Sequence, residues 1–196
     1  MIYLDVDGVL ADFVSGACDF FDRPRPKEHD GQIDYHWYRD WGMSREEFLG
    51  NLLSPEADPL SESLRPLPWA KSLYYTCDSY DSVRFLSAIW HSPAAWAGRL
   101  KWLKRHLEVD PSKVILVGEA EAKAHFATDL DGRANFLVDD REDNIEAWCA
   151  AGGRGFLWPG PANPKWSDYH IMERGESAGT FYHLCDRLRN WQLEVH

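Results

Sequence analysis

The segment Asp5-Val6-Asp7-Gly8, close to the N-terminus, has residue types and a spacing that suit attack on a phosphorus atom. It follows an apolar run, so Asp5 would stand at the end of a buried strand, where its carboxylate can act as a nucleophile. Asp7, two residues later, could protonate the leaving oxygen and then activate a water molecule. Gly8 allows the chain to turn sharply as it leaves the strand. The alternative is an ordinary strand-end turn with solvated carboxylates.

The elements that must position these acids follow an alternating pattern of strands and helices. Five short apolar runs are typical of buried parallel strands: Met1–Val6, Ser82–Ala88, Lys113–Gly118, Ala134–Val138 and Gly155–Leu157. Helical patterns lie between and after them, over Trp69–Tyr80, Pro93–Leu107, Glu119–Ala127, Glu142–Ala151 and Ala178–Leu193. This order predicts an α/β fold with a doubly wound (Rossmann-like), mostly parallel five-stranded sheet.

A long stretch between the first two predicted strands breaks this alternation. It is rich in proline and aromatic residues, and Arg45–Leu49 behind Ser44 has the N-cap and acidic first turn of a short helix. We therefore expect a small, mainly helical cap over the carboxyl edge of the sheet, where open α/β sheets bind ligands. The predicted boundaries are residues 1–14 and 68–196 for the core domain and 15–67 for the cap.

The segment Asp5–Phe13, DVDGVLADF, resembles the first motif of the haloacid dehalogenase (HAD) superfamily of phosphatases. With Phe13 included, it is most similar to the 5'(3')-deoxyribonucleotidase or 5'-nucleotidase branch of that superfamily. The resemblance covers residues 1–20 and 80–158 and is faint within the cap. It implies that Asp5 and Asp7 are catalytic and that the reaction passes through an aspartyl-phosphate.

The resemblance also implies a phosphate-binding serine or threonine at the end of the second core strand. Ser87 matches this position, and the backbone N–H of Ala88 could share the task. Thr76 is a rival, but Trp69–Tyr80 is predicted to be the helix that enters this strand. A helix or turn cap is the alternative role of Ser87.

The third family motif is a lysine that neutralises the charge of the phosphate and of the nucleophile. Lys123 follows the third predicted strand and matches this motif. Lys113 is the alternative, but it begins that strand and would face the opposite end of the sheet. A solvated helix lysine is the simpler alternative for Lys123. The gap to the next motif is longer than in nucleotidases, and residues 129–133 could form a loop that accounts for it.

The fourth family motif is a pair of acids that ends a strand and binds a metal ion, matched here by Asp139-Asp140. The resemblance implies that Asp139 binds the cation directly, whereas Asp140 holds a metal-bound water or Lys123. Asp5 and the backbone carbonyl of Asp7 would complete the set. Hard oxygen ligands and retained waters suit Mg²⁺, which is the expected cofactor. Asp140 could instead cap the helix that follows.

The nucleotidase resemblance implies that the cap selects the substrate and that the ring of Phe13 stacks on a base. The other candidates for this contact are aromatic residues of the cap: Trp37, Tyr38, Trp41 and Phe48. These cap rings could equally form the small core of the cap. The expected activity is Mg²⁺-dependent hydrolysis of phosphomonoesters, with (deoxy)nucleoside monophosphates as substrates. A sugar phosphate or another small phosphoester, and a non-catalytic ligand-binding role, are the alternatives.

Composition restricts the partners of the chain. The formal net charge of −11 argues against a polynucleotide partner and an anionic membrane surface. The expected partner is a small phosphorylated substrate, and the sequence leaves the oligomeric state open. The four cysteines show no zinc-site spacing and are expected to be reduced thiols. With no signal peptide recognisable and no apolar run of membrane-spanning length, we expect a cytoplasmic protein.

Overall fold

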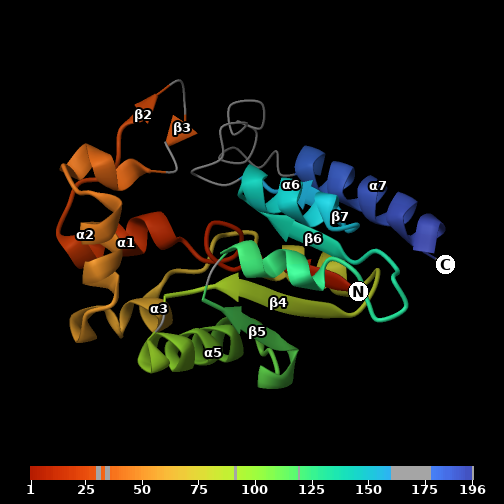
Figure 1. Ribbon diagram of the computed structural model, residues 1–196, viewed down its shortest axis with the longest axis horizontal. Helices are drawn as coiled ribbons and strands as arrows, with labels where there is room; N and C mark the ends of the chain where they lie inside the picture. The colour runs from red at the N-terminus through yellow and green to blue at the C-terminus, as the bar shows by residue number, and fades with distance from the viewer. Residues whose placement is uncertain (30–31, 34–35, 91, 119, 160–177, 196) are drawn as a thin grey trace.

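A computed structural model describes residues 1–29, 32–33, 36–90, 92–118, 120–159 and 178–195. Its centre is a parallel five-stranded sheet with the strand order β5-β4-β1-β6-β7 (Figure 1). The strands are β1 Ile2–Leu4, β4 Val83–Ala88, β5 Val114–Val117, β6 Phe136–Asp139 and β7 Arg154–Leu157. The predicted α/β fold and five-stranded sheet are therefore confirmed, and each of the five apolar runs overlaps one strand of that sheet.

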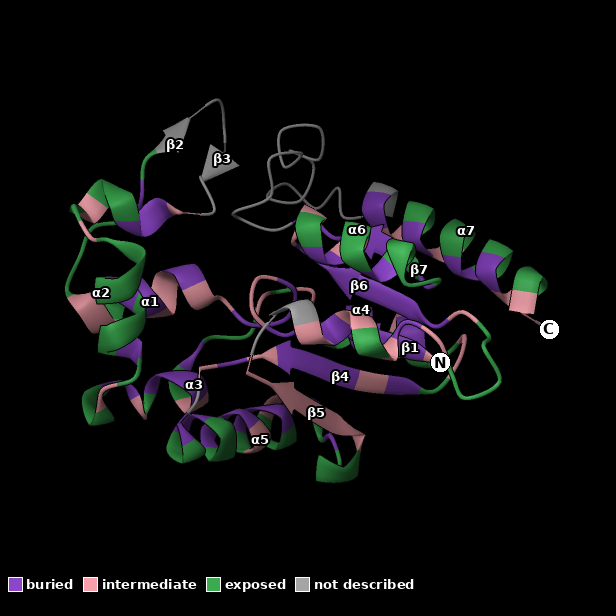
Figure 2. Ribbon diagram, in the orientation of Figure 1, coloured by how far each residue is buried: buried purple, intermediate pink, exposed green. Residues whose placement is uncertain are grey.

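Alternate residues of the strands pack on opposite faces of the sheet. Ile2 and Leu4 join the larger core, whereas Tyr3, between them, belongs to a second cluster with Leu137 and Trp148. Because side chains alternate along a strand, two buried faces require a run that is apolar throughout. This requirement explains why the strands are recognisable as continuous apolar segments. In Figure 2 the buried residues lie along β4 and β6, and the exposed ones lie on the outer faces of the helices.

The core helices agree with the predicted ones, with one exception. They are α4 Ala70–Asp78, α5 Pro93–Leu107, α6 Glu142–Ala150 and α7 Ala178–Val195. The segment predicted as a helix over Glu119–Ala127 is instead a 3₁₀ helix, η4 Ala120–Phe126. Tighter turns of this kind serve as short connectors. Lys123 lies on this connector, and its buried ammonium group forms two ion pairs.

The stretch between β1 and α4 holds short elements at one end of the sheet (Figure 1). They are α1 Phe13–Phe21, the hairpin strands β2 Glu28–His29 and β3 Gln32–Ile33, η1 Trp37–Trp41, α2 Arg45–Leu52, η2 Pro55–Ala57 and α3 Leu60–Ser63. Ser44 caps α2 in a capping box with Glu47, as its sequence predicts. The two ends of this cap segment are joined, since Asp12 N–H donates to the Arg65 carbonyl at 2.9 Å.

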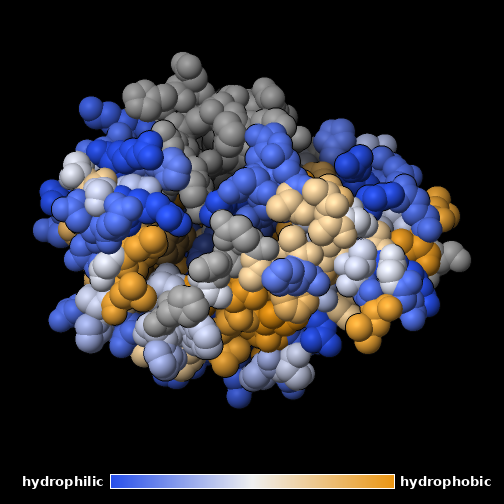
Figure 3. All heavy atoms as spheres, in the orientation of Figure 1, coloured by the Kyte–Doolittle hydropathy of each residue, from blue (hydrophilic) through white to orange (hydrophobic). Residues whose placement is uncertain are grey.

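Three further facts concern the edge of the sheet, the helices and the cysteines. The edge strand β5 is only half-buried, and Figure 3 shows hydrophobic residues gathered over this part of the molecule. None of the helices in the described part of the chain has the length and apolarity that a membrane span requires. All four cysteines are free thiols.

Candidate active site

The site lies where three neighbouring strands end. Asp5 directly follows β1, Ser87 is the penultimate residue of β4, and Asp139 is the last residue of β6. Because β4 and β6 flank β1 in a parallel sheet, all three side chains emerge at the same edge. Asp5 N–H donates to the Val138 carbonyl at 3.0 Å, which extends the pairing of β1 and β6 up to the site.

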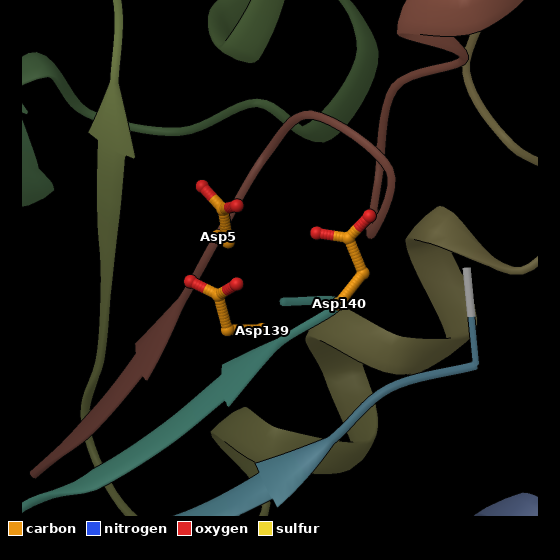
Figure 4. A group of neighbouring side chains, drawn as sticks. All are labelled: Asp5, Asp139 and Asp140. Atoms are coloured by element: carbon orange, nitrogen blue, oxygen red, sulfur yellow. The ribbon is translucent and has the colours of Figure 1, made fainter. Parts of the chain in front are cut away.

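Three carboxylates meet at this edge. Asp5, Asp139 and Asp140 each offer an oxygen, and these oxygens lie within 4.8 Å of one another. Figure 4 shows the three side chains at the ends of β1 and β6, with Asp139 on the last residue of β6. All three residues are buried, and the most accessible of them, Asp140, is 9% exposed. Like charges that lie this close together and are buried away from water repel one another strongly unless cations compensate them.

Lys123 supplies one compensating cation. Its ammonium nitrogen lies 2.9 Å from Asp5 Oδ1 and 2.7 Å from Asp139 Oδ2, and its side chain is 2% exposed. The structure thus brings together the lysine and acids that the sequence singled out. Lys113, the alternative, is half-exposed at the opposite end of β5 and pairs with Asp78.

The two adjacent acids have different partners from those expected. Lys123 pairs with Asp139, and the described residues show no ion pair between Lys123 and Asp140, so of the two roles expected of Asp140 the metal-bound water stays a prediction. Asp139 also accepts hydrogen bonds from the Arg141 N–H at 2.9 Å and from Asn144 Nδ2 at 3.0 Å. The side chain of Asp140 has no hydrogen bond or ion pair with the described residues. Asn144 was not recognised from the sequence, although its place five residues after Asp139 puts it in the first turn of α6.

The negative charges of this cluster outnumber the positive charge of Lys123 beside them. Burial raises the pKa of Asp5 to about 7, Lys123 opposes this rise, and Asp139 adds to it. Burial likewise raises the pKa of Asp140, together with the charges of Asp139 and Asp5. Burial alone would lower the pKa of Lys123, but the two carboxylates beside it outweigh burial and raise this pKa. In the described part of the chain, Lys123 is the ammonium group that these three carboxylates surround, and a further cation would relieve their repulsion.

Gly8 makes room for Asp140. Its φ of 78° lies in the left-handed region, which side chains other than glycine seldom adopt. A Cβ atom at this position would overlap the Asp140 carboxylate. The turn after β1 therefore needs glycine both for its backbone conformation and for the close approach of the acid.

Asp7 lies outside the three-acid cluster and contacts a different cation. Arg99 Nη2 lies 2.8 Å from Asp7 Oδ1 and 2.7 Å from Oδ2. Arg99 comes from α5, and its side chain is 0% exposed, whereas that of Asp7 is 21% exposed. Sequence reasoning missed this residue because an isolated arginine in an amphipathic helix normally indicates an exposed face.

Ser87 is fully buried at the end of β4, and its Oγ has no hydrogen-bond partner among the described residues. Buried hydroxyls are normally paired, so an unpaired one at a strand end needs an explanation. Ala88 is the last residue of β4 and lies next to it. Thr76, the rival candidate, lies within α4.

Two of the cap aromatics proposed as substrate contacts are buried among themselves. Trp37 and Tyr38 pack against Phe48, and the Tyr38 and Phe48 rings stack with centroids 4.8 Å apart. Trp41 packs against Trp37, and its Nε1 donates to the Pro24 carbonyl at 3.0 Å. Trp37, Tyr38 and Phe48 belong to the same buried cluster as Ile2 and Leu4 of the sheet, and Trp41 packs against that cluster.

Phe13 has a different position, between the cap and the sheet. Its ring centroid lies 6.3 Å from that of Trp37 and 6.3 Å from that of Trp90. Trp90 follows β4 by two residues, and its buried Nε1 has no partner among the described residues. The sequence analysis did not single out Trp90, although its place just after the predicted Ser87 strand was a usable signal.

No protein-family model matches the chain, and no curated protein matches it. Solved structures do match its fold. A phosphonoacetaldehyde hydrolase-like protein from Oleispira antarctica has a TM-score of 0.52 at 17% identity, with 97% of this chain and 84% of that chain covered. A HAD family hydrolase from Deinococcus radiodurans, solved with bound phosphate and sodium, has a TM-score of 0.50 at 14% identity, with 83% and 82% covered. An L-2-haloacid dehalogenase has a TM-score of 0.50 at 16% identity, with 83% and 86% covered. The chain therefore has the α/β fold of HAD-superfamily hydrolases, with its buried acid cluster at the carboxyl edge of the sheet.

Proposed function

We propose that this protein is a Mg²⁺-dependent phosphomonoester hydrolase that uses Asp5 as its nucleophile. The observation that carries this proposal is the contact of Asp5 with Lys123, beside Asp139 and Asp140, at the carboxyl edge of the sheet. A carboxylate held by a buried ammonium group next to a divalent-cation site is suited to attack an anionic phosphate.

The residues present fit a magnesium ion. Carboxylates are hard oxygen donors, and the excess negative charge of the cluster suits a small divalent cation. Asp5, Asp140 and the backbone carbonyl of Asp7 would hold the ion. Asp139, whose oxygens already accept from Lys123, Asn144 and the Arg141 N–H, would orient the cluster. When bound, Mg²⁺ supplies positive charge that favours the ionised form of Asp5 and offsets the charge of the phosphate.

The residues of this chain divide the reaction into two steps. In the first, an Asp5 oxygen forms a bond to phosphorus and the bond to the leaving oxygen breaks, while Asp7 gives that oxygen a proton. In the second, a water molecule gives a proton to Asp7 and attacks phosphorus, which releases phosphate and restores the Asp5 carboxylate. Lys123 and Ser87 Oγ would bind the oxygens of the transferred group.

For the substrate, we propose a (deoxy)nucleoside monophosphate, on the basis of the sequence resemblance and the position of Phe13. The half-buried Phe13 ring, with Trp90 beside it, offers an aromatic surface near the cap. Trp37 and Tyr38 would support this surface from behind, since both are buried. A sugar phosphate or another small phosphoester remains the alternative substrate class.

A panel of phosphoesters tests the activity. Purified protein with Mg²⁺ is expected to release phosphate from nucleoside monophosphates faster than from sugar phosphates. Excess chelator should stop the release and added Mg²⁺ should restore it, because the acid cluster would lose and regain its cation. Free phosphate is the measured quantity. Full activity in excess chelator would contradict the metal assignment, and no release from any ester in the panel would contradict the function.

The variant Phe13→Ala tests the nucleotide proposal. We expect KM to rise about tenfold for a nucleoside monophosphate and to change little for 4-nitrophenyl phosphate, since stacking on a base contributes about 1–3 kcal/mol. Steady-state kinetics on both esters measure the difference. Phe20→Ala is the matched control, because Phe20 lies on the same helix but packs on Phe21. An equal change in KM for both esters would show that Phe13 does not bind the base.

A further inference from the structure

Arg99 occupies an unusual position for a charged residue. It lies in the middle of α5, its side chain is completely buried, and it contacts Asp7 from 92 residues away in the sequence. The contact is made by Nη2 alone, which reaches both carboxylate oxygens of Asp7.

The described residues leave the rest of the guanidinium group without a hydrogen-bond partner. Nε and Nη1 of Arg99 are buried, and no described residue offers them an acceptor. Buried donors without acceptors destabilise a folded protein, and a buried ion pair seldom adds stability over a well-packed apolar residue. A purely structural role therefore explains Arg99 poorly, and a role in the neighbouring site explains it better.

The helix that carries Arg99 is fixed against the end of the cap segment. Ser61 Oγ donates to the Ala95 carbonyl at 2.7 Å, and Trp102 Nε1 donates to the Leu64 carbonyl at 2.7 Å. These bonds lie on either side of Arg99 along α5. The guanidinium group is thus presented to Asp7 from a rigid element, as precise positioning requires.

Among the described residues, Asp7 forms an ion pair with Arg99 and with no other cation. Lys123 is engaged by Asp5 and Asp139, and the described residues place only Arg99 in an ion pair with Asp7. Asp7 lies immediately before Gly8 and two residues after Asp5. Its ion pair with Arg99 therefore fixes the direction of a carboxylate that lies beside the acid cluster.

We propose that Arg99 is a positioning residue that holds the Asp7 carboxyl group on the leaving-group side of the phosphorus and apart from the Asp5, Asp139 and Asp140 cluster. This inference rests on the proposed function. When Asp7 gives its proton to the leaving oxygen, the alcohol departs and Asp7 becomes a carboxylate, which the guanidinium group stabilises. Asp7 regains a proton from the attacking water in the second step, so protons balance over the cycle.

Two esters separate positioning of the acid from other roles. An alkyl phosphate needs a proton on its leaving oxygen, whereas 4-nitrophenolate departs without one. In single-turnover experiments with Arg99→Met, we expect the release of the alcohol to slow at least about 100-fold. The release of 4-nitrophenolate should change less than about threefold, because that step does not use Asp7 as an acid.

Two further variants complete the test. Arg105→Met is the matched control, because Arg105 lies on the same helix but is exposed and pairs with Glu62. Arg99→Lys retains the charge without the fork of donors and should show a smaller loss of the same selectivity. It also serves as the test variant if Arg99→Met does not fold. In an Asp7→Asn background, Arg99→Lys should add no further loss, since it acts through Asp7.

The results that would overturn the inference are distinct. Equal slowing of both esters would indicate a structural role, and a raised KM for both with unchanged leaving-group dependence would indicate direct binding of phosphate. If the wild-type protein hydrolyses both esters and Arg99→Met does not discriminate between them, only this inference fails. If the wild-type protein hydrolyses neither, the proposed function fails with it.

Discussion

Replacing Asp5 by asparagine is expected to lower kcat by at least about 10⁴-fold while the protein remains folded. An amide has the size of the carboxylate but cannot attack phosphorus to form an acyl phosphate. The fold should tolerate the change, because Asp139 still holds Lys123 at 2.7 Å and one of three clustered carboxylates is removed. Phosphate release and circular dichroism measure the two effects.

Trapping the covalent intermediate makes this test specific. In wild-type protein quenched with acid during turnover, mass spectrometry should find one added phosphoryl group on the peptide that contains Asp5. The Asp5→Asn variant should lack it. Asp19→Asn, an exposed change in α1, is the control and should behave as wild type. Near-normal turnover by Asp5→Asn would show that another residue is the nucleophile.

The sheet could be predicted from the sequence because its central strands are buried on both faces. Mostly apolar runs such as Ser82–Ala88 and Ala134–Val138 carry this signal without any tertiary information. The segment around Lys123 could not be predicted as well. It was predicted as an α-helix but forms 3₁₀ turns, and the ion pairs of Lys123 with Asp5 and Asp139 depend on tertiary contacts that the sequence pattern does not carry.

Sequence reasoning could predict those site residues whose acidic side chains come at the ends of recognisable strands. Asp5, Asp139 and Asp140 follow apolar runs, so sheet topology alone brings them together. Partner choice was not predictable, because Asp139 and Asp140 are adjacent and only the direction of each side chain decides which one meets Lys123. Arg99 could not be recognised from the sequence either, because its contact with Asp7 depends on how α5 packs against the rest of the protein.

Lys123→Met is expected to destabilise the metal-free protein by about 3–5 kcal/mol at pH 8, the usual effect of removing one member of a buried charge pair. The variant leaves Asp5, Asp139 and Asp140 together in the protein interior with no cation among them. Urea unfolding in the presence of chelator measures the free energy of unfolding. Lys113→Met, a half-exposed lysine at the far end of β5, should change it by less than about 0.5 kcal/mol.

The pH dependence of this loss has a definite sign. Burial already raises the pKa of Asp5 to about 7 with Lys123 present, and removing the lysine raises the pKa further. A carboxyl group whose pKa is higher in the folded state than in the unfolded state favours folding below its unfolded value of about 4. This contribution is lost as the pH rises through the folded value. The free energy of unfolding of Lys123→Met should therefore fall from pH 4 to beyond about pH 7.

A second substitution identifies repulsion as the cause. Adding Asp139→Asn to Lys123→Met removes one of the three charges, and should recover part of the lost stability at pH 8 and little at pH 5. Mg²⁺ should stabilise Lys123→Met more at pH 8 than at pH 5, since it binds the ionised acids. If, without divalent cations, Lys123→Met is as stable as wild type at pH 8, then repulsion among these carboxylates does not destabilise the variant. The excess negative charge of the cluster lowers the free energy of unfolding without a divalent cation, and the same charge would attract such a cation. Measurements of stability and of cation binding therefore test the same electrostatic argument.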